Sequence, residues 1–192
     1  YQLTHHDVFE HDLGTPPLLY TAKVNGRTVK GVAVMRTDGW MFLFDRKTGK
    51  PLVPVAEQPV PQNARQKTAA TQPFPAGDQV GPNCIEPGRV PDGFALGCYF
   101  EALDAGKPNL VPPTITTRSS PIAYAPESQR FFVAAGAPIV WMRRWEDARI
   151  FTAVSAMPYA KGFGILAALD ATSNKIAWQK RVPWPVQDGS GF

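Results

Sequence analysis

The sequence predicts an all-β fold built from short strands and tight turns. Its 192 residues are 44% hydrophobic and 11% aromatic, so the chain can bury a core. Twenty prolines and sixteen glycines punctuate the chain, and runs of helix-favouring residues at helical spacing are missing. Two hairpin patterns and a repeated turn pattern point the same way.

The first hairpin is expected between Lys30 and Asp45. Two apolar runs, Lys30 to Arg36 and Trp40 to Asp45, flank the turn residues Thr37-Asp38-Gly39. Both alternating sets of positions in the second run are apolar. Trp40, Phe42 and Phe44 would point to one face of a strand, and Met41 and Leu43 to the other. We therefore expect this strand to be buried on both faces.

A long proline-rich segment follows, from Pro51 to Pro113. It holds twelve of the twenty prolines and has almost no clean periodicity, which indicates an inserted loop or a functional lid without regular structure. Its aromatic residues should anchor it against the rest of the fold. Cys84 and Cys98 lie in this segment, and they form either a disulfide bridge or two separate thiols.

A second hairpin is expected from Pro121-Ile-Ala-Tyr-Ala125, through the turn Pro126-Glu-Ser-Gln129, to Arg130-Phe-Phe-Val-Ala-Ala135. Turn residues again separate two strand-like runs.

An internal repeat is the most informative feature. In Ala168-Leu-Asp170-Ala-Thr-Ser-Asn174-Lys-Ile-Ala-Trp178, an Asp follows a strand, a turn comes next, and a Trp stands eight residues after the Asp. The stretch Leu43-Phe-Asp45-Arg-Lys-Thr-Gly49-Lys-Pro-Leu-Val53 repeats this frame, with Val53 in place of the Trp. Each copy predicts a strand, a turn capped by Asp and an outer strand, as in a propeller blade. We expect Trp178 to be substantially buried against a neighbouring sheet.

Charge excludes some functions. The formal net charge of +4 comes from scattered Lys and Arg residues, which argues against a nucleic-acid groove. His5, His6 and His11 do not suit a three-histidine metal site, because neighbouring strand residues point to opposite faces.

The frames resemble the tryptophan-docking motif of the eight-bladed quinoprotein dehydrogenases, which bind pyrroloquinoline quinone (PQQ). Tyr1-Gln-Leu-Thr-His5-His6-Asp7-Val-Phe-Glu10-His-Asp12 looks like the family segment that delivers the catalytic carboxylate. Pro59-Val-Pro-Gln62 and Thr71-Gln-Pro-Phe74 are similar to a motif pair of the membrane glucose and quinate dehydrogenase branch. The resemblance implies an incomplete β-propeller of about two to three blades over residues 1–192, with 51–113 as an inserted loop.

The resemblance also implies a site. Glu10 occupies the position of the family's catalytic Asp, and Arg36 that of the residue that hydrogen-bonds the quinone oxygens. Glu10 and Asp12 are the candidate metal ligands, for calcium or a lanthanide. Glu10 and Arg36 should lie on the same side of the sheets. The stretch Thr117-Arg-Ser-Ser-Pro121 stands where the family has a glycine-rich cofactor contact.

The implied reaction passes hydride from the carbinol carbon of a sugar or alcohol to PQQ, with a metal polarising the quinone carbonyl. The implied partners are this substrate, a quinone or cytochrome electron acceptor, and the missing blades of the same protein. The implied location is the periplasm, with membrane association through a missing N-terminal region. The opening Tyr-Gln-Leu-Thr reads like the middle of a strand, so we expect the true N-terminus upstream.

Three hypotheses stay open at this point. The chain is part of a PQQ-dependent dehydrogenase and inactive alone, a non-catalytic propeller of the same ancestry used for binding or assembly, or an independent β-sandwich whose frames are coincidental.

Overall fold

The computed structural model confirms the all-β prediction. The residues it describes are 1–7, 11, 13–62, 67–85, 92–101, 106–111, 121–137, 140–143, 153–156 and 163–183. These residues form thirteen strands and no helix. Within the same ranges, no helix has the length and apolar character needed to cross a membrane.

The first sheet contains the predicted hairpin. Strands β1 (Leu18–Val24), β2 (Arg27–Met35) and β3 (Met41–Asp45) pair antiparallel in that order. The Arg36 N–H donates to the Trp40 carbonyl at 2.9 Å and closes the turn, in which Gly39 adopts a positive φ of 87°. The hairpin prediction is confirmed.

The second sheet has the four-stranded form of a propeller blade. Its order is β13-β12-β9-β8, and all neighbours are antiparallel. The strands are β8 (Ala123–Ala125), β9 (Arg130–Ala137), β12 (Phe163–Asp170) and β13 (Ile176–Val182). Strands β8 and β9 form the second predicted hairpin, which is confirmed.

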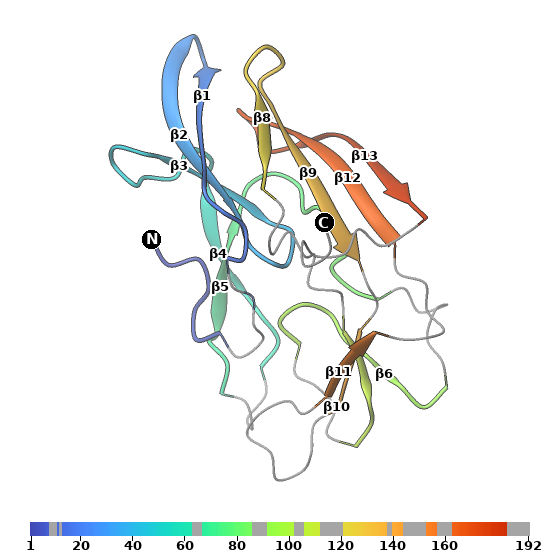
Figure 1. Ribbon diagram of the computed structural model, residues 1–192. Coiled ribbons are helices and arrows are strands. Elements are labelled where there is room, and N and C mark those ends of the chain that lie inside the picture. Colours follow the sequence, from blue (N-terminus) through green and yellow to red (C-terminus); the bar gives the residue numbers. More distant parts are fainter. Residues whose placement is uncertain are drawn as a thin grey trace.

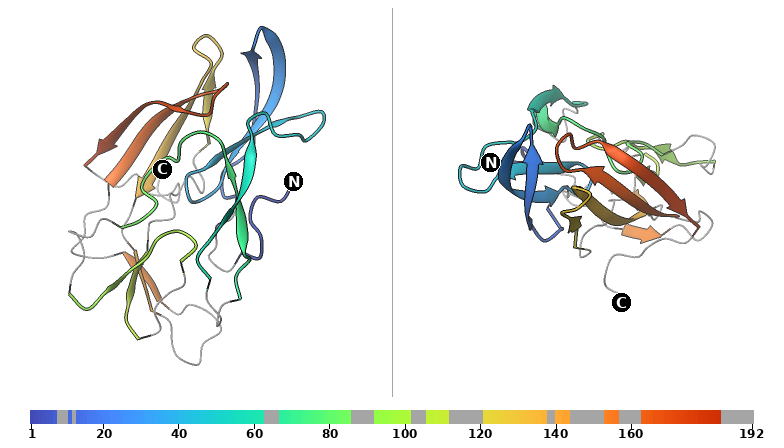
Figure 2. Two further views of the ribbon diagram at one scale, coloured as in Figure 1. Left: turned by 180° about the vertical axis from the view of Figure 1, so that it is seen from behind. Right: turned by 90° about the horizontal axis from the view of Figure 1, so that it is seen from above.

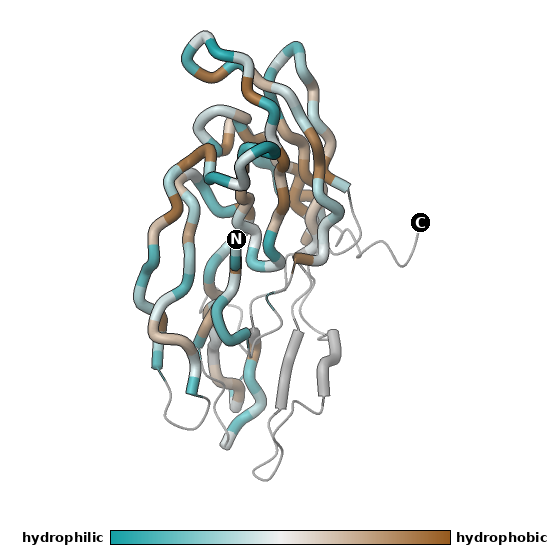
Figure 3. The backbone as a smooth tube through the Cα atoms, turned by 90° about the vertical axis from the view of Figure 1, so that its left-hand side faces the viewer, coloured by the Kyte–Doolittle hydropathy of each residue, from teal (hydrophilic) through white to brown (hydrophobic). Residues whose placement is uncertain are grey.

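The two sheets stand side by side in the upper part of the molecule (Figure 1). Their facing side chains form the main core, with Met35, Met41 and Leu43 on one sheet and Phe131 and Ile165 on the other. The hydrophobic stretches of these strands are visible in the upper half of Figure 3. Burial of these faces is the main favourable term in the folding of this region.

Strand β3 separates two cores. Met41 and Leu43 point into the main core, whereas Phe42 and Phe44 lie in a second cluster with Leu3 and Val34. The first four residues of β3 are buried. The prediction that this strand is covered on both faces is confirmed.

The proline-rich segment contains regular structure, so the expectation of a structureless loop is wrong. Strands β4 (Val55–Pro59) and β5 (Thr71–Pro75) form an antiparallel hairpin that extends away from the first sheet (Figure 2). Strands β6 (Ala95–Leu96) and β7 (Asn109–Val111) pair in parallel. Prolines are compatible with β4 and β5 because this two-stranded sheet consists of edges alone.

A fourth sheet joins the end of this segment to a later insertion. Strands β10 (Val140–Arg143) and β11 (Ala153–Ala156) lie between β9 and β12 in sequence and complete the order β11-β10-β7-β6. The expected aromatic anchoring is also present, because Tyr99 and Phe100 are buried with Val60, and Phe74 packs against them.

The two predicted Asp turns have matching geometry. Asp45 Oδ1 accepts from the N–H groups of Lys47 and Thr48, both at 2.9 Å. Asp170 Oδ1 accepts from the N–H groups of Thr172 and Ser173 at 3.0 and 2.9 Å. These bonds to the ionised form lower the pKa of Asp45; at Asp170 partial burial raises the pKa, but the hydrogen bonds together outweigh it and the net shift is downward.

The two turns differ at their last position, where Gly49 has a φ of 69° and Asn174 a φ of 59°. Asn174 is fully buried, and its Nδ2 donates to the carbonyls of Met41 and Ala76 at 2.8 and 3.0 Å. Asn tolerates this left-handed conformation better than most residues. Its amide therefore ties the second sheet to the first.

Replacing Asn174 with Gly should cost roughly 1–3 kcal/mol in the free energy of unfolding, because the backbone is preserved while two buried carbonyls lose their donors. Urea denaturation measures this loss. In the matched control, Gly49→Asn, the exposed turn should keep most of its stability, since asparagine tolerates the positive φ and a Cβ there meets no neighbouring atom. Wild-type stability in Asn174→Gly would show that the Asn174 bonds contribute nothing.

The prediction that Trp178 is substantially buried is wrong for this chain. Its exposed fraction is 42%, and its ring lies 6.2 Å from that of Phe132 on the outer face of the second sheet. Its counterpart in the first frame, Val53, is buried in the main core at 5% exposure. The first frame has a sheet packed against it, whereas Leu166 and Trp178 on the equivalent face of the second remain exposed at 37% and 42%.

Candidate functional site

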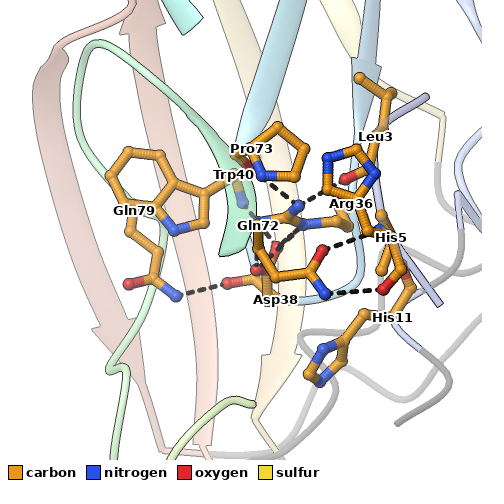
Figure 4. A network of polar contacts seen from close by, with 10 residues as sticks. Leu3, His5, His11, Arg36, Asp38, Trp40, Gln72, Pro73 and Gln79 are labelled. Atoms are coloured by element: carbon orange, nitrogen blue, oxygen red, sulfur yellow. Dashed lines mark hydrogen bonds and ion pairs between the residues drawn. The ribbon is translucent and has the colours of Figure 1, made fainter. Parts of the chain in front are cut away.

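Arg36 is the centre of a buried polar cluster at the end of β2. Its side chain is fully buried, and its donors reach three partners (Figure 4). Nε lies 3.0 Å from each carboxylate oxygen of Asp38. Nη1 donates to the carbonyls of Leu3 and Pro73, at 2.5 and 3.0 Å. The guanidinium therefore joins the chain start, the turn after β2 and strand β5.

Among the described residues, one nitrogen of this guanidinium has Asp38 as its single neighbouring acceptor group. Nη2 lies 2.8 Å from Asp38 Oδ2, close enough for an ion pair, but its N–H bonds find no hydrogen-bond acceptor among the described residues. A buried guanidinium N–H without an acceptor is costly and suits a carbonyl or carboxylate oxygen. In its donor chemistry, Arg36 therefore fits the quinone oxygens of PQQ.

Aromatic rings enclose the same guanidinium. The rings of Phe42, Phe74 and Phe100 each have their centroid 5.2 Å from Arg36 Cζ. At this distance a cation is attracted to the ring, and the attraction strengthens away from water. The rings hold the charge in place and also separate it from solvent.

Asp38 is a buried member of the cluster that sequence reasoning treated only as a turn residue. Its carboxyl group is fully buried, and its backbone carbonyl accepts from Gln79 Nε2 at 2.7 Å. Burial raises the pKa of Asp38, and the Arg36 charge opposes this rise. The spacing Arg-x-Asp across a tight turn was the one available signal for this pair.

The N-terminal segment, residues 1–7 together with His11, is fastened to this cluster. The Gln72 side chain accepts from the His5 N–H at 2.8 Å and donates to the His5 carbonyl at 2.7 Å. His5 Nε2 also lies 2.9 Å from Glu57 Oε1, and Thr4 Oγ1 donates to the His11 carbonyl at 3.0 Å. Gln72 and Pro73 belong to the Thr71–Phe74 motif, so this motif helps to hold residues 1–7 beside Arg36.

His11 is buried beside Arg36. Its ring meets the rings of Phe100 and Tyr99 edge-on, with centroids 4.5 and 5.2 Å away. Burial, together with the positive charge of Arg36, lowers the pKa of His11 to about 3. The imidazole is therefore neutral in the folded protein at physiological pH.

This pKa predicts an acid-sensitive fold. Unfolded His11 binds a proton near pH 6.5 and the folded form only near pH 3, so stability falls as the pH drops between these values. The contribution is roughly 2 kcal/mol lost between pH 7 and pH 5. Urea denaturation at both pH values should show a smaller loss for His11→Gln than for the wild-type chain. The same loss in both proteins would contradict the assignment.

The structure tests the other candidate residues only in part. Glu10, Asp12 and positions 117–120 lie outside the described residues, so their relation to Arg36 stays a prediction. Within the described ranges, no group of three or more His, Cys, Asp and Glu residues is arranged to hold a metal ion.

The two cysteines are joined. Cys84 and Cys98 form a disulfide that closes a loop across fourteen positions. Closing a loop of that size contributes about 3 kcal/mol through the reduced entropy of the unfolded chain. The alternative of two separate thiols is thereby excluded.

Comparison with known proteins shows which sequences this chain resembles. Residues 1–89 match the family model described as the β-propeller domain of glucose, ethanol and alcohol dehydrogenases that use PQQ. Residues 1–89 are therefore similar to this quinoprotein domain. The chain is 38% identical to quinoprotein glucose dehydrogenase A of Acinetobacter calcoaceticus over 82 residues. It is 40% identical to the quinoprotein glucose dehydrogenase of Escherichia coli K12 over 76 residues.

These matches cover part of each protein. Each includes 38% of this chain and 10% of the relative, so the chain spans about a tenth of the quinoprotein dehydrogenases it matches. The quinohemoprotein alcohol dehydrogenase from Comamonas testosteroni superposes with a TM-score of 0.54 at 21% identity, over 96% of this chain and 27% of that structure. This likeness shows the fold: part of a β-propeller. It excludes an independent β-sandwich with coincidental frames.

Proposed function

We propose that the chain is part of a PQQ-dependent alcohol or sugar dehydrogenase. The observation that carries the proposal is the attachment of the N-terminal segment to Arg36 and Gln72, because it brings two family motifs and the candidate quinone-binding arginine together. The similarity of residues 1–89 to quinoprotein dehydrogenases supports the same conclusion.

The residues of this chain have distinct roles in the proposal. Bound PQQ supplies a quinone that accepts hydride from the carbinol carbon of the substrate. Glu10 removes the proton of the substrate hydroxyl, and Arg36 Nη2 donates hydrogen bonds to the quinone oxygens. Glu10 and Asp12 contribute carboxylate oxygens to calcium or a lanthanide ion. A quinone or cytochrome receives the electrons.

A further propeller blade is the proposed structural partner. In the first frame, Met41, Leu43 and Val53 contact the neighbouring sheet. When the two frames are aligned on their Asp residues, the corresponding positions of the second frame are Leu166, Ala168 and Trp178. Leu166 and Trp178 are exposed at 37% and 42%. A blade that packs on this face would cover both residues, as the second sheet covers the first. This packing blade would be one of the missing blades of the same protein.

The proposed location is the periplasm, with attachment to the membrane through a region outside this chain. The Cys84–Cys98 disulfide supports an oxidising compartment, because cytosolic proteins seldom keep such bridges.

One observation favours a second candidate, a non-catalytic propeller that serves in binding or assembly. Arg36 has no exposed surface and is surrounded by Asp38 and aromatic rings. A quinone therefore reaches the guanidinium only if these surrounding side chains move. Equilibrium titration of the natural full-length protein with PQQ, with and without calcium, separates the two candidates. The dehydrogenase proposal predicts saturable, calcium-strengthened binding that Arg36→Ala weakens; absence of binding under both conditions would overturn it.

A further inference from the structure

The backbone at Phe100 is unusual. Its φ is 63°, a left-handed conformation that phenylalanine rarely adopts. The Glu101 N–H donates to the Cys98 carbonyl at 3.2 Å, which makes Phe100 the third residue of a four-residue turn. A positive φ at that position ordinarily selects glycine or asparagine. A ring at a position suited to glycine indicates that the side chain has a role worth the backbone cost.

The ring lies at the meeting point of the site elements. It is 2% exposed, 5.2 Å from Arg36 Cζ and 4.5 Å from the His11 ring. It also meets Phe74 edge-on, with centroids 5.9 Å apart. One side chain therefore contacts the guanidinium, the residue that follows Glu10 in sequence, and the Thr71–Phe74 motif.

The turn that carries Phe100 is held firmly. The first residue of the turn, Cys98, forms a disulfide with Cys84. The Cys98 N–H also donates to Glu101 Oε2 at 2.9 Å. Beside the bridge, the Tyr99 N–H donates to the Asn83 carbonyl at 3.1 Å. The chain just before Asn83 is fixed to the Arg36 turn, because Val80 N–H donates to the Gly39 carbonyl at 2.9 Å. Hydrogen bonds and the disulfide therefore connect the backbone at Phe100 to the same cluster that its ring contacts.

We propose that Phe100 is a positioning residue for the quinone site, and that the Cys84–Cys98 bridge holds it there. The ring limits the directions that the Arg36 guanidinium can take and fixes His11, the neighbour of Glu10. This inference rests on the proposed function and adds a residue and a bridge that act through others. Holding donor and base in place before binding reduces the entropy lost when quinone and substrate arrive.

Phe100→Gly is the decisive variant, because glycine suits the turn and removes only the ring. Two readouts are measured on the natural full-length protein: PQQ affinity, and hydrogen exchange of the apo protein over residues 1–11. We expect PQQ affinity to fall about tenfold and exchange to accelerate by a similar factor. Cys84→Ser combined with Cys98→Ser should shift both readouts in the same direction.

Two controls separate positioning from simple packing. Phe100→Tyr keeps the ring and should retain wild-type values, and Phe132→Ala removes a ring on the outer face of the second sheet and should change neither readout. Wild-type affinity and exchange in Phe100→Gly would overturn the inference. If the wild-type protein binds no PQQ, the proposed function fails, and the exchange measurement on apo protein alone decides the role of Phe100.

Discussion

Asp38→Asn should destabilise the protein by about 3–5 kcal/mol, since it leaves the Arg36 charge buried without a counter-ion. Both side chains of the pair are fully buried, and the Asp38 carboxylate accepts from Nε and forms the ion pair with Nη2. The free energy of unfolding from urea denaturation, followed by tryptophan fluorescence, measures the loss. The Asp38 carboxylate thus has a larger effect than any single hydrogen bond in the cluster.

A double variant controls for simple damage to the turn. Arg36→Met combined with Asp38→Asn removes the buried charge together with its partner, so its loss should be smaller than the sum of the two single losses. Additive losses, or a loss below about 1 kcal/mol for Asp38→Asn, would mean that the pair is hydrated and contributes little.

Glu10→Gln should abolish dehydrogenation by the natural full-length protein while PQQ binding persists. The amide keeps the size of the side chain but cannot take the proton of the substrate hydroxyl, and loss of a general base lowers kcat about 10²- to 10⁴-fold. Dye-linked oxidation of aldoses and alcohols gives kcat, and equilibrium titration gives the PQQ affinity.

Glu10→Asp is the matched control. Aspartate restores the carboxylate that the quinoprotein family has at this position and removes one methylene. We expect it to retain or raise kcat, because a displacement of about an ångström at the reacting group can change rates a hundredfold. If Glu10→Gln keeps wild-type kcat, position 10 is not the base.

Local signals made much of the fold predictable. The turn residues Thr37-Asp38-Gly39 and Pro126–Gln129 act over a few residues, so both hairpins followed from the sequence. The repeat predicted the Asp turns at 45 and 170 because an Asp carboxylate caps its own turn.

Contacts between residues far apart in the chain could not be predicted from the sequence. Arg36 was assigned to the quinone from its place in the family pattern, but nothing local reveals that it binds Leu3 and Pro73 or that Asp38 is buried with it. Trp178 was expected to be buried because the frame pairs it with a neighbouring sheet, and the sequence does not say which face is covered. The left-handed Phe100 had no signal, because no local rule places a ring there.

Substrate-dependent reduction of an electron acceptor by the PQQ-loaded protein tests the central claim most directly. The natural full-length protein is saturated with PQQ and calcium, and a dye acceptor is followed after addition of glucose or ethanol. The account predicts oxidation with at least one of these substrates that requires PQQ and disappears in Glu10→Gln. Tight PQQ binding with oxidation of neither glucose nor ethanol would contradict it and would favour a non-catalytic propeller.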